Sequence, residues 1–292
     1  MRVRVGAGTG VELLVAAMAV ADADWRVVFT AGAETYDAAL VAGGRGLARD
    51  AGRIGRIGWT NLLSPLTRRR GAWSVEALRA SVAAMPAPEL HQLLVGRRSP
   101  GSAWLRRTDP TEVRRTCLHV LDTLPTPTAR TPVLTRVRAR LAEVGPEQLL
   151  DEVAPGLHYG PGVLDDVVLV TSSQVAPIVV ELAEPDRTVI VHPPLGESGA
   201  TDAGARLRDL GRALGDATRI RVLQQLKGGR RSLPELCTAL DTPRTTLLHH
   251  LALLRGAGLV DLSVTAGEAN VYRLRPEGFE QLARAARAFP LQ

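Results

Sequence analysis

A short segment near the C-terminus brings together side chains that can read the edges of nucleic-acid bases. Arg244, Thr245 and His249 offer hydrogen-bonding groups, and Leu248 offers an apolar contact. Arginine can bond guanine O6 and N7 together, threonine can bond a base or touch a thymine methyl, and histidine can donate to a base or a phosphate. Displayed on the outward face of one helix, these residues would recognise sequence in the major groove of DNA.

The spacing of residues 242–256 predicts that helix. Thr242 is expected to be its N-cap, and Pro243 to stand in the first turn, where a missing N–H costs little. The opposite face is apolar and would hold the helix to a core through Leu247, Leu251 and Leu254. For Leu248, two interpretations stay open: contact with a thymine methyl, or packing into the core.

Two shorter helices are predicted before this one. Asp216 is a suitable N-cap for the first, which should end at Gly228-Gly229. Ser232 can cap the second, with Glu235 at the capping-box position.

A β-hairpin and a last helix are predicted after the recognition segment. Residues 259–264 and 270–275 alternate apolar and polar side chains around Ala266-Gly267, which is typical of two paired strands. Residues 277–289 have the pattern of an amphipathic helix. Together with the preceding helices, this order predicts a winged helix-turn-helix.

A second group of residues near this surface is expected to contact DNA, mainly at the sugar-phosphate backbone. Its members are Thr242, Thr246, Arg231 and Asn270. Asn270 lies at the tip of the wing beside Glu268, a carboxylate that phosphates would repel. The wing is therefore expected to contribute little beyond Asn270.

Positive charge is concentrated in the same part of the chain. The net charge is +6, and residues 201–292 hold 14 basic and 9 acidic residues, a net of +5. Such a balance indicates a polyanionic partner for this region. The 45% hydrophobic and 23% charged fractions are typical of a globular protein, and the apolar run Val11–Val20 is too short to span a bilayer. We therefore expect a cytoplasmic protein that does not insert into a membrane.

The C-terminal region resembles the ArsR/SmtB family of bacterial winged-helix regulators. The matching segments occur in the family's order and spacing: Ala213–Leu223, Glu235–Leu240, Leu247–Arg255, Gly258–Val260 and Val271–Leu274. The resemblance implies a homodimeric transcription factor, usually a repressor, that binds an inverted-repeat operator in double-stranded DNA and is released by an effector.

The metal sites of that family are not reproduced in this sequence. Counting back from Cys237, the positions of the family's Cys-x-Cys pair hold Ser232 and Pro234. The last helix, residues 277–289, contains no histidine. Elsewhere, Cys117 is two residues from a histidine, a spacing that does not place both on one helical face. We therefore expect no metal and no other cofactor, and a small-molecule effector that is not a metal.

The upstream region has a different pattern. Helices are predicted over 74–84, where Ser74 is a suitable N-cap, over 113–124, and over 133–150 with a break at Gly145-Pro146. Three segments rich in valine and isoleucine predict a small meander or hairpin sheet: Asp166–Thr171, Pro177–Leu182 and Arg187–His192. The fold class is therefore predicted to be α+β and mostly α.

Two domains are predicted from these patterns. A stretch rich in proline, glycine and small polar residues at 193–204 has the composition of a linker. Residues 1–195 would form a helical domain with a small β-meander, serving as a sensor or for dimerisation. Residues 204–292 would form the winged helix-turn-helix domain. Four tryptophans in the first domain are candidates either for pocket walls or for core anchors: Trp25, Trp59, Trp73 and Trp104.

An alternative function comes from the first residues of the chain. A strand-like segment, Arg2–Val5, runs into the glycines of Gly6–Gly10 and then an apolar helix, as in dinucleotide-binding turns. This would make the protein a nucleotide-binding enzyme or redox sensor fused to a DNA-binding domain. However, the third glycine of the G-x-G-x-x-G fingerprint is replaced by Val11, and the region lacks a regular strand–helix alternation. We therefore expect no enzymatic activity.

Overall fold

The computed structural model describes residues 1–26, 29, 32–69, 73–96, 102–127, 131–176, 178–195 and 203–288. The first part of the described chain contains β1 (Arg2–Ala7), α1 (Thr9–Ala21), α2 (Ala23–Arg26), α3 (Ala33–Asn61), α4 (Leu63–Arg68), α5 (Val75–Ala84), α6 (Ala87–Val95), α7 (Ala103–Arg107), α8 (Pro110–Thr123) and α9 (Thr131–Val153). It continues with β2 (Leu157–Tyr159), β3 (Asp166–Thr171), β4 (Val180–Ala183), β5 (Thr188–His192), α10 (Ala203–Leu214), α11 (Ala217–Lys227), β6 (Arg231–Ser232), α12 (Leu233–Leu240), α13 (Arg244–Gly256), β7 (Val260–Val264), β8 (Val271–Leu274) and α14 (Pro276–Ala288).

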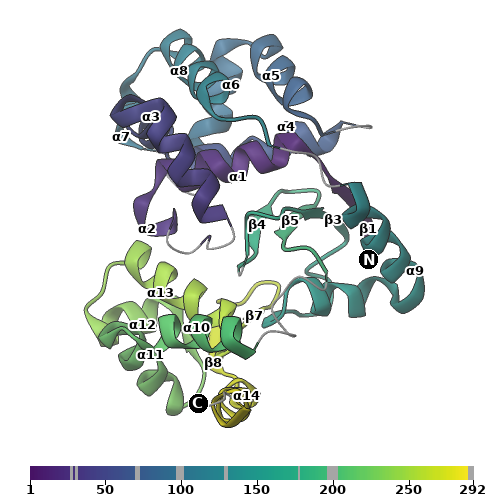
Figure 1. Ribbon diagram of the computed structural model, residues 1–292, viewed down its shortest axis with the longest axis vertical. Coiled ribbons are helices and arrows are strands. Elements are labelled where there is room, and N and C mark those ends of the chain that lie inside the picture. Colours follow the sequence, from purple (N-terminus) through teal and green to yellow (C-terminus); the bar gives the residue numbers. More distant parts are fainter. Residues whose placement is uncertain are drawn as a thin grey trace.

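The prediction of a mostly helical α+β fold is confirmed. Figure 1 shows the helices α1 to α8 at one end of the molecule, the sheet that contains β1 in the middle, and α10 to α14 at the other end. The side chain of Ser74 caps α5 by accepting from the N–H of Ala77 at 3.2 Å, as the sequence predicts. The break predicted at Gly145 is a kink within α9, where that residue has a φ of 79°.

The three valine-rich segments do not form the predicted meander. The first sheet has the strand order β1-β3-β5-β4, and β1, β3 and β5 are parallel. Only β4 runs antiparallel, pairing with β5 as a hairpin. The strand predicted over Pro177–Leu182 is observed as β4, two residues shorter and displaced toward Ala183, and Pro177 itself lies outside the described residues.

Burial on both faces explains the parallel arrangement. Val168 and Val170 of β3 belong to a buried apolar cluster with the N-terminal helices, which we call the N-terminal core and which includes Trp59. The alternate residues Val167 and Leu169 belong to a second cluster, which we call the C-terminal core. A strand buried on both faces is apolar throughout, which is typical of parallel sheets and differs from the alternation of a half-exposed meander.

The glycines after β1 have a packing role. An added Cβ at Gly6 would lie 2.1 Å from the ring of Trp73, and one at Gly8 would lie 2.2 Å from the Trp73 carbonyl oxygen. The N–H of Gly10 donates to that same oxygen at 2.8 Å, and the hydroxyl of Thr9 accepts from the N–H of Val75 at 3.1 Å. The close approach of the Trp73 segment therefore accounts for this glycine-rich turn.

The C-terminal core contains side chains from both sides of the predicted linker. It includes Leu149 of α9 and Leu169 of β3 together with Leu223 of α11 and Leu247 of α13. The second sheet also joins the two parts, because its order is β2-β7-β8-β6 and β2 pairs in parallel with β7. Of the predicted linker, residues 196–202 lie outside the described residues. The division into domains 1–195 and 204–292 stays a prediction.

Candidate nucleic-acid interface

The helices α11, α12 and α13 form the helix-turn-helix, and the caps of α11 and α12 match the sequence predictions. Asp216 caps α11 by accepting from the N–H of Arg219 at 3.0 Å. Ser232 and Glu235 form a complete capping box at the start of α12. Asp241, which ends α12, is left-handed with a φ of 48°, and this turns the chain sharply into α13.

A polar cluster fixes α11 against α13. Arg219 donates from Nε to the carbonyl oxygen of Ala213 at 2.8 Å, and its Nη1 lies 3.4 Å from Nδ1 of His250. The same imidazole nitrogen lies 3.6 Å from a carboxylate oxygen of Asp216. Burial lowers the pKa of His250, because the neutral ring loses less hydration than the charged one. His250 therefore serves to orient the recognition helix from its buried side.

The start of α13 differs by one residue from the prediction. The helix begins at Arg244 with Pro243 as its N-cap, and no side chain caps it. Thr242, predicted as the N-cap, instead donates its hydroxyl to the carbonyl oxygen of Leu240 at 3.1 Å. Arg244, Thr245 and Thr246 are exposed in the first turn. The structure thus brings these three predicted contact residues together on an accessible surface.

Leu248 and His249 lie in less accessible positions. Leu248 is half-buried, and its side chain packs against the C-terminal core. His249 is half-buried, and its ring meets the ring of Trp25 edge-on with centroids 6.2 Å apart. The face of α13 that carries His249 is therefore turned toward α2 of the N-terminal part.

The second half of α13 packs against the N-terminal part as well. Ala252 belongs to the N-terminal core, and Leu253 packs against it. Arg255 donates from Nη2 to the carbonyl oxygen of Val179 at 3.4 Å. Figure 1 shows α13 lying beneath α2, with α11 and α12 farther from the N-terminal helices. The recognition helix is thus the element of the helix-turn-helix that the N-terminal part covers.

The predicted wing is present as β7 and β8. Asn270 is exposed at its tip, directly before β8. Arg231 is half-buried in the two-residue strand β6, at the edge of the same sheet. At the base of the wing, buried Asp261 pairs with Arg273 of the opposite strand at 2.9 Å. Arg231 and Asn270 are therefore carried by the same small sheet, whose two central strands are joined by this ion pair.

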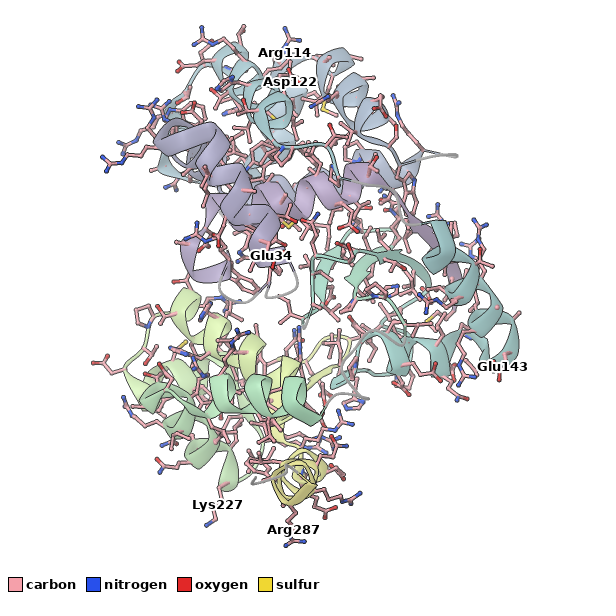
Figure 2. All side chains as sticks on the ribbon, viewed as in Figure 1. Glu34, Arg114, Asp122, Glu143, Lys227 and Arg287 are labelled. Carbon is pink, nitrogen blue, oxygen red and sulfur yellow. The ribbon has the colours of Figure 1, made fainter. Side chains whose placement is uncertain are left out.

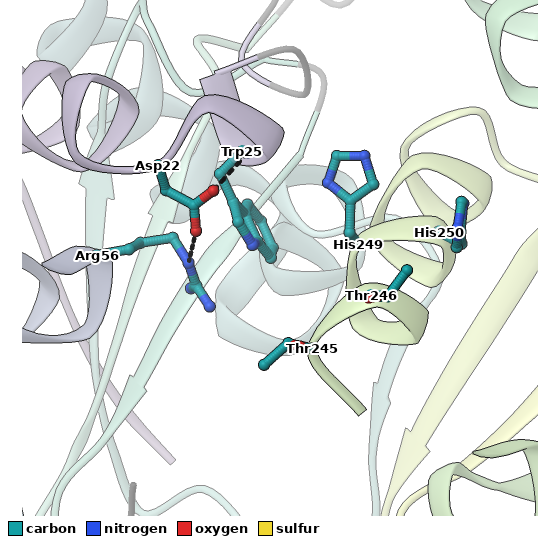
Figure 3. A pocket seen from close by; sticks show the side chains of 7 residues that line it. All are labelled: Asp22, Trp25, Arg56, Thr245, Thr246, His249 and His250. Atoms are coloured by element: carbon teal, nitrogen blue, oxygen red, sulfur yellow. Dashed lines mark hydrogen bonds and ion pairs between the residues drawn. The ribbon is translucent and has the colours of Figure 1, made fainter. Parts of the chain in front are cut away.

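A cavity of about 270 Å³ lies between α13 and the N-terminal helices. It is lined by Asp22, Trp25, Arg56, Thr245, Thr246, His249 and His250. Figure 3 shows the side chains of Trp25 and Arg56 facing the first turns of α13. The sequence leaves Trp25 as a candidate for either a pocket wall or a core anchor, and the structure places it in the wall of this cavity. The sequence gives no signal for Arg56, because the two helices meet only in the folded chain.

The remaining tryptophans and the cysteines have packing roles. Trp59 is fully buried and donates to the carbonyl oxygen of Ala51 at 3.0 Å, and the ring of Trp104 lies 5.4 Å from the guanidinium carbon of Arg53. Burial raises the pKa of the Cys117 thiol, so this group stays protonated. Among the residues that the structure describes, no three His, Cys, Asp or Glu side chains form a group able to hold a metal ion.

Comparison with known families identifies the C-terminal element. Residues 214–263 match the family model of a helix-turn-helix domain, which spans α11 to β7. No curated protein matches the chain. The chain therefore contains a helix-turn-helix of the kind found in DNA-binding transcription regulators, and its hairpin makes the domain a winged one. Within the described part of the chain, every helix is too short or too polar to cross a lipid bilayer.

Proposed function

We propose that the protein is a sequence-specific transcriptional repressor of the ArsR/SmtB type that binds an inverted-repeat operator as a homodimer. The observation that carries this proposal is the helix-turn-helix match together with three exposed side chains on the first turn of α13: Arg244, Thr245 and Thr246. Two copies related by a twofold axis would place their recognition helices in successive major grooves, about 34 Å apart. The regulator acts in the cytoplasm, and the proposal includes no enzymatic activity and no cofactor.

Basic residues of this region also lie away from α13. Lys227 at the end of α11 and Arg287 in the last turn of α14 project from the end of the molecule opposite the N-terminal helices, whereas His249 of α13 faces α2 (Figure 2). The net charge of +5 over residues 201–292 favours DNA as the partner of this region.

The experiment that tests the function is selection of bound fragments from genomic DNA by the purified full-length chain. Enrichment of fragments that share an inverted repeat, with half-sites about one helical turn apart, would support the proposal. The proposal would be contradicted if neither the unaltered chain nor the Trp25 variant described below retained a duplex of any sequence.

Arg244→Ala is expected to relax specificity at one base pair of the operator. A bidentate arginine–guanine contact contributes about 1–3 kcal/mol of discrimination, so the preference for the right base should fall roughly 10- to 100-fold. The measurement is fluorescence anisotropy with a set of operators that each carry one substitution. Arg284→Ala is the matched control, since Arg284 is an exposed arginine on α14. Unchanged discrimination at every position would refute the assignment of Arg244.

The position of α13 implies that the structure represents a form that does not bind DNA. A major groove is about 12 Å wide and 8.5 Å deep, and a duplex that reached His249 would occupy the space of α2. We propose that DNA binding requires α2 to move away from α13. The apparent affinity for DNA would then be reduced by the fraction of molecules in the covered form.

Trp25→Ala is expected to raise the affinity for operator DNA. The edge-on contact with His249 stabilises the covered form by about 0.5–1.5 kcal/mol in addition to the area that it buries. Its loss should therefore increase the fraction of molecules that can bind DNA and tighten DNA binding roughly 2- to 10-fold. Trp104→Ala is the matched control, because Trp104 is a half-buried tryptophan of the same region that stacks on Arg53. An affinity of the Trp25 variant equal to or lower than that of the unaltered chain would contradict the proposal.

A further inference from the structure

The cavity between α2, α3 and α13 is built by both parts of the chain. Asp22, Trp25 and Arg56 come from the N-terminal helices, and Thr245, Thr246 and His249 come from the recognition helix. Ligand pockets occur preferentially at such junctions, and a volume of about 270 Å³ is just below the range of about 300–1,000 Å³ usual for them, so the ligand would be small. A ligand bound there would contact both α2 and α13, the two helices that we propose must separate before DNA can bind.

The wall formed by the N-terminal helices presents one cation. The guanidinium carbon of Arg56 lies 4.1 Å from the centroid of the Trp25 ring, so the two planar groups stack. Asp22 forms an ion pair with this arginine, because one carboxylate oxygen lies 3.9 Å from Nε of Arg56. The other carboxylate oxygen accepts a hydrogen bond from the backbone N–H of Trp25 at 3.2 Å. Figure 3 shows the end of the guanidinium turned away from Asp22 and toward Thr245.

The Arg56 guanidinium has lost part of its hydration. Only 25% of the side chain is exposed, and burial lowers its pKa although Asp22 acts in the opposite direction. A second anion on the open side of the guanidinium would compensate for this loss and would use the terminal N–H groups as a fork.

The opposite wall supplies neutral donors and a ring. The hydroxyls of Thr245 and Thr246 border the cavity, and neither hydroxyl is used to cap α13. The ring of His249 stands edge-on to Trp25 beside them. This combination of hydroxyls and aromatic edges is suited to a small planar molecule with one negatively charged group.

We infer that this cavity is an effector site for a small aromatic carboxylate, which Arg56 binds from one side and Thr245, Thr246 and His249 contact from the other. This inference rests on the proposed function. A ligand that touches both walls binds only when α2 covers α13, so it stabilises the covered form. By linkage the ligand weakens DNA binding by the same factor by which DNA weakens ligand binding.

The ligand site is tested without DNA by isothermal titration calorimetry on the full chain, with benzoate as the probe and neutral benzamide as its control. Benzoate is expected to bind at millimolar concentration and more tightly than benzamide. Arg56→Gln should weaken benzoate binding about 10-fold or more, because charge-assisted hydrogen bonds are lost. Arg49→Gln, an exposed arginine of the same helix, should leave it unchanged.

A second variant covers the case in which Arg56→Gln does not fold. Thr245→Val changes an exposed hydroxyl on α13 and should weaken benzoate binding with little effect on stability. No benzoate binding by the unaltered chain, equal binding of benzamide, or benzoate binding unchanged in the Arg56 and Thr245 variants would overturn the inference.

The regulatory part is tested by measuring operator affinity with and without benzoate. Benzoate should weaken operator binding by the unaltered chain and have a smaller effect on Arg56→Gln. An operator affinity unaffected by saturating benzoate would overturn the regulatory role. A chain that binds benzoate through Arg56 but binds no DNA would refute the proposed function and leave the ligand site standing, so the two failures are distinguishable.

Discussion

Arg187→Met should lower the free energy of unfolding by about 3 kcal/mol, because it removes one partner of a buried ion pair. The Arg187 side chain is 2% exposed and pairs with Glu184, whose side chain is 9% exposed. Its terminal nitrogens also donate to the carbonyl oxygens of Thr67 at 3.2 Å and Ser64 at 2.9 Å. One guanidinium thus ties α4 to the loop between β4 and β5, and its loss leaves these oxygens without that donor.

Arg68→Met is the matched control for this prediction. Arg68 contacts the same carboxylate, Glu184, at 3.1 Å and also Asp186 at 2.7 Å, but its side chain is 47% exposed. An exposed pair contributes about 0–1 kcal/mol, so this variant should unfold at nearly the same urea concentration as the unaltered chain. Equal midpoints for Arg187→Met and Arg68→Met in urea unfolding would refute the role assigned to Arg187.

Acid should destabilise the fold through His192. This residue is fully buried at the end of β5, and burial lowers its pKa from 6.5 to about 4. The unfolded chain therefore binds a proton that the folded chain does not, and stability falls as the pH decreases from about 6.5 to 4. A shift of this size corresponds to a loss of roughly 3 kcal/mol from this one group. Buried His250 has its pKa lowered too and acts in the same direction.

The test is urea unfolding at several pH values between 6.5 and 4. His192→Gln should flatten the dependence of stability on pH, because the titrating group is removed. His119→Gln is the control, since His119 is exposed on α8. The assignment is wrong if the His192 variant keeps the pH slope of the unaltered chain.

The helix-turn-helix was predictable from the sequence because its signals are local. The caps at Asp216 and Ser232 lie within three residues of the groups that they bond, and helical leucine spacing fixes the buried face of α13. The sequence places the start of α13 one residue early, because the Thr242 hydroxyl donates to the Leu240 carbonyl oxygen and does not cap the helix. Local bonds from threonine side chains to the backbone compete with helix capping in this way.

The first sheet and the covered recognition helix were not predictable in the same way. Val3 of β1 pairs with Val167 of β3, although the helices α1 to α9 lie between these two strands in the sequence. The residues next to either strand in the sequence therefore do not indicate which residues pair. One signal was present, since the uninterrupted apolar run Val167–Val170 indicates a strand buried on both faces. The contact between Trp25 and His249 arises from two helices far apart in the chain, so spacing alone gave no indication that His249 would be half-buried.

The pairing of β2 with β7 limits how this protein can be shortened. A fragment beginning at residue 204 would contain the complete helix-turn-helix and its hairpin, but not Leu157–Tyr159. Its β7 would become an outer strand with free N–H and C=O groups, and the apolar side chains that meet Leu149 and Leu169 would face water. A second copy of the fragment could then pair one of its strands with the open edge of β7. Its self-association would then arise from truncation and would not test the proposed homodimer.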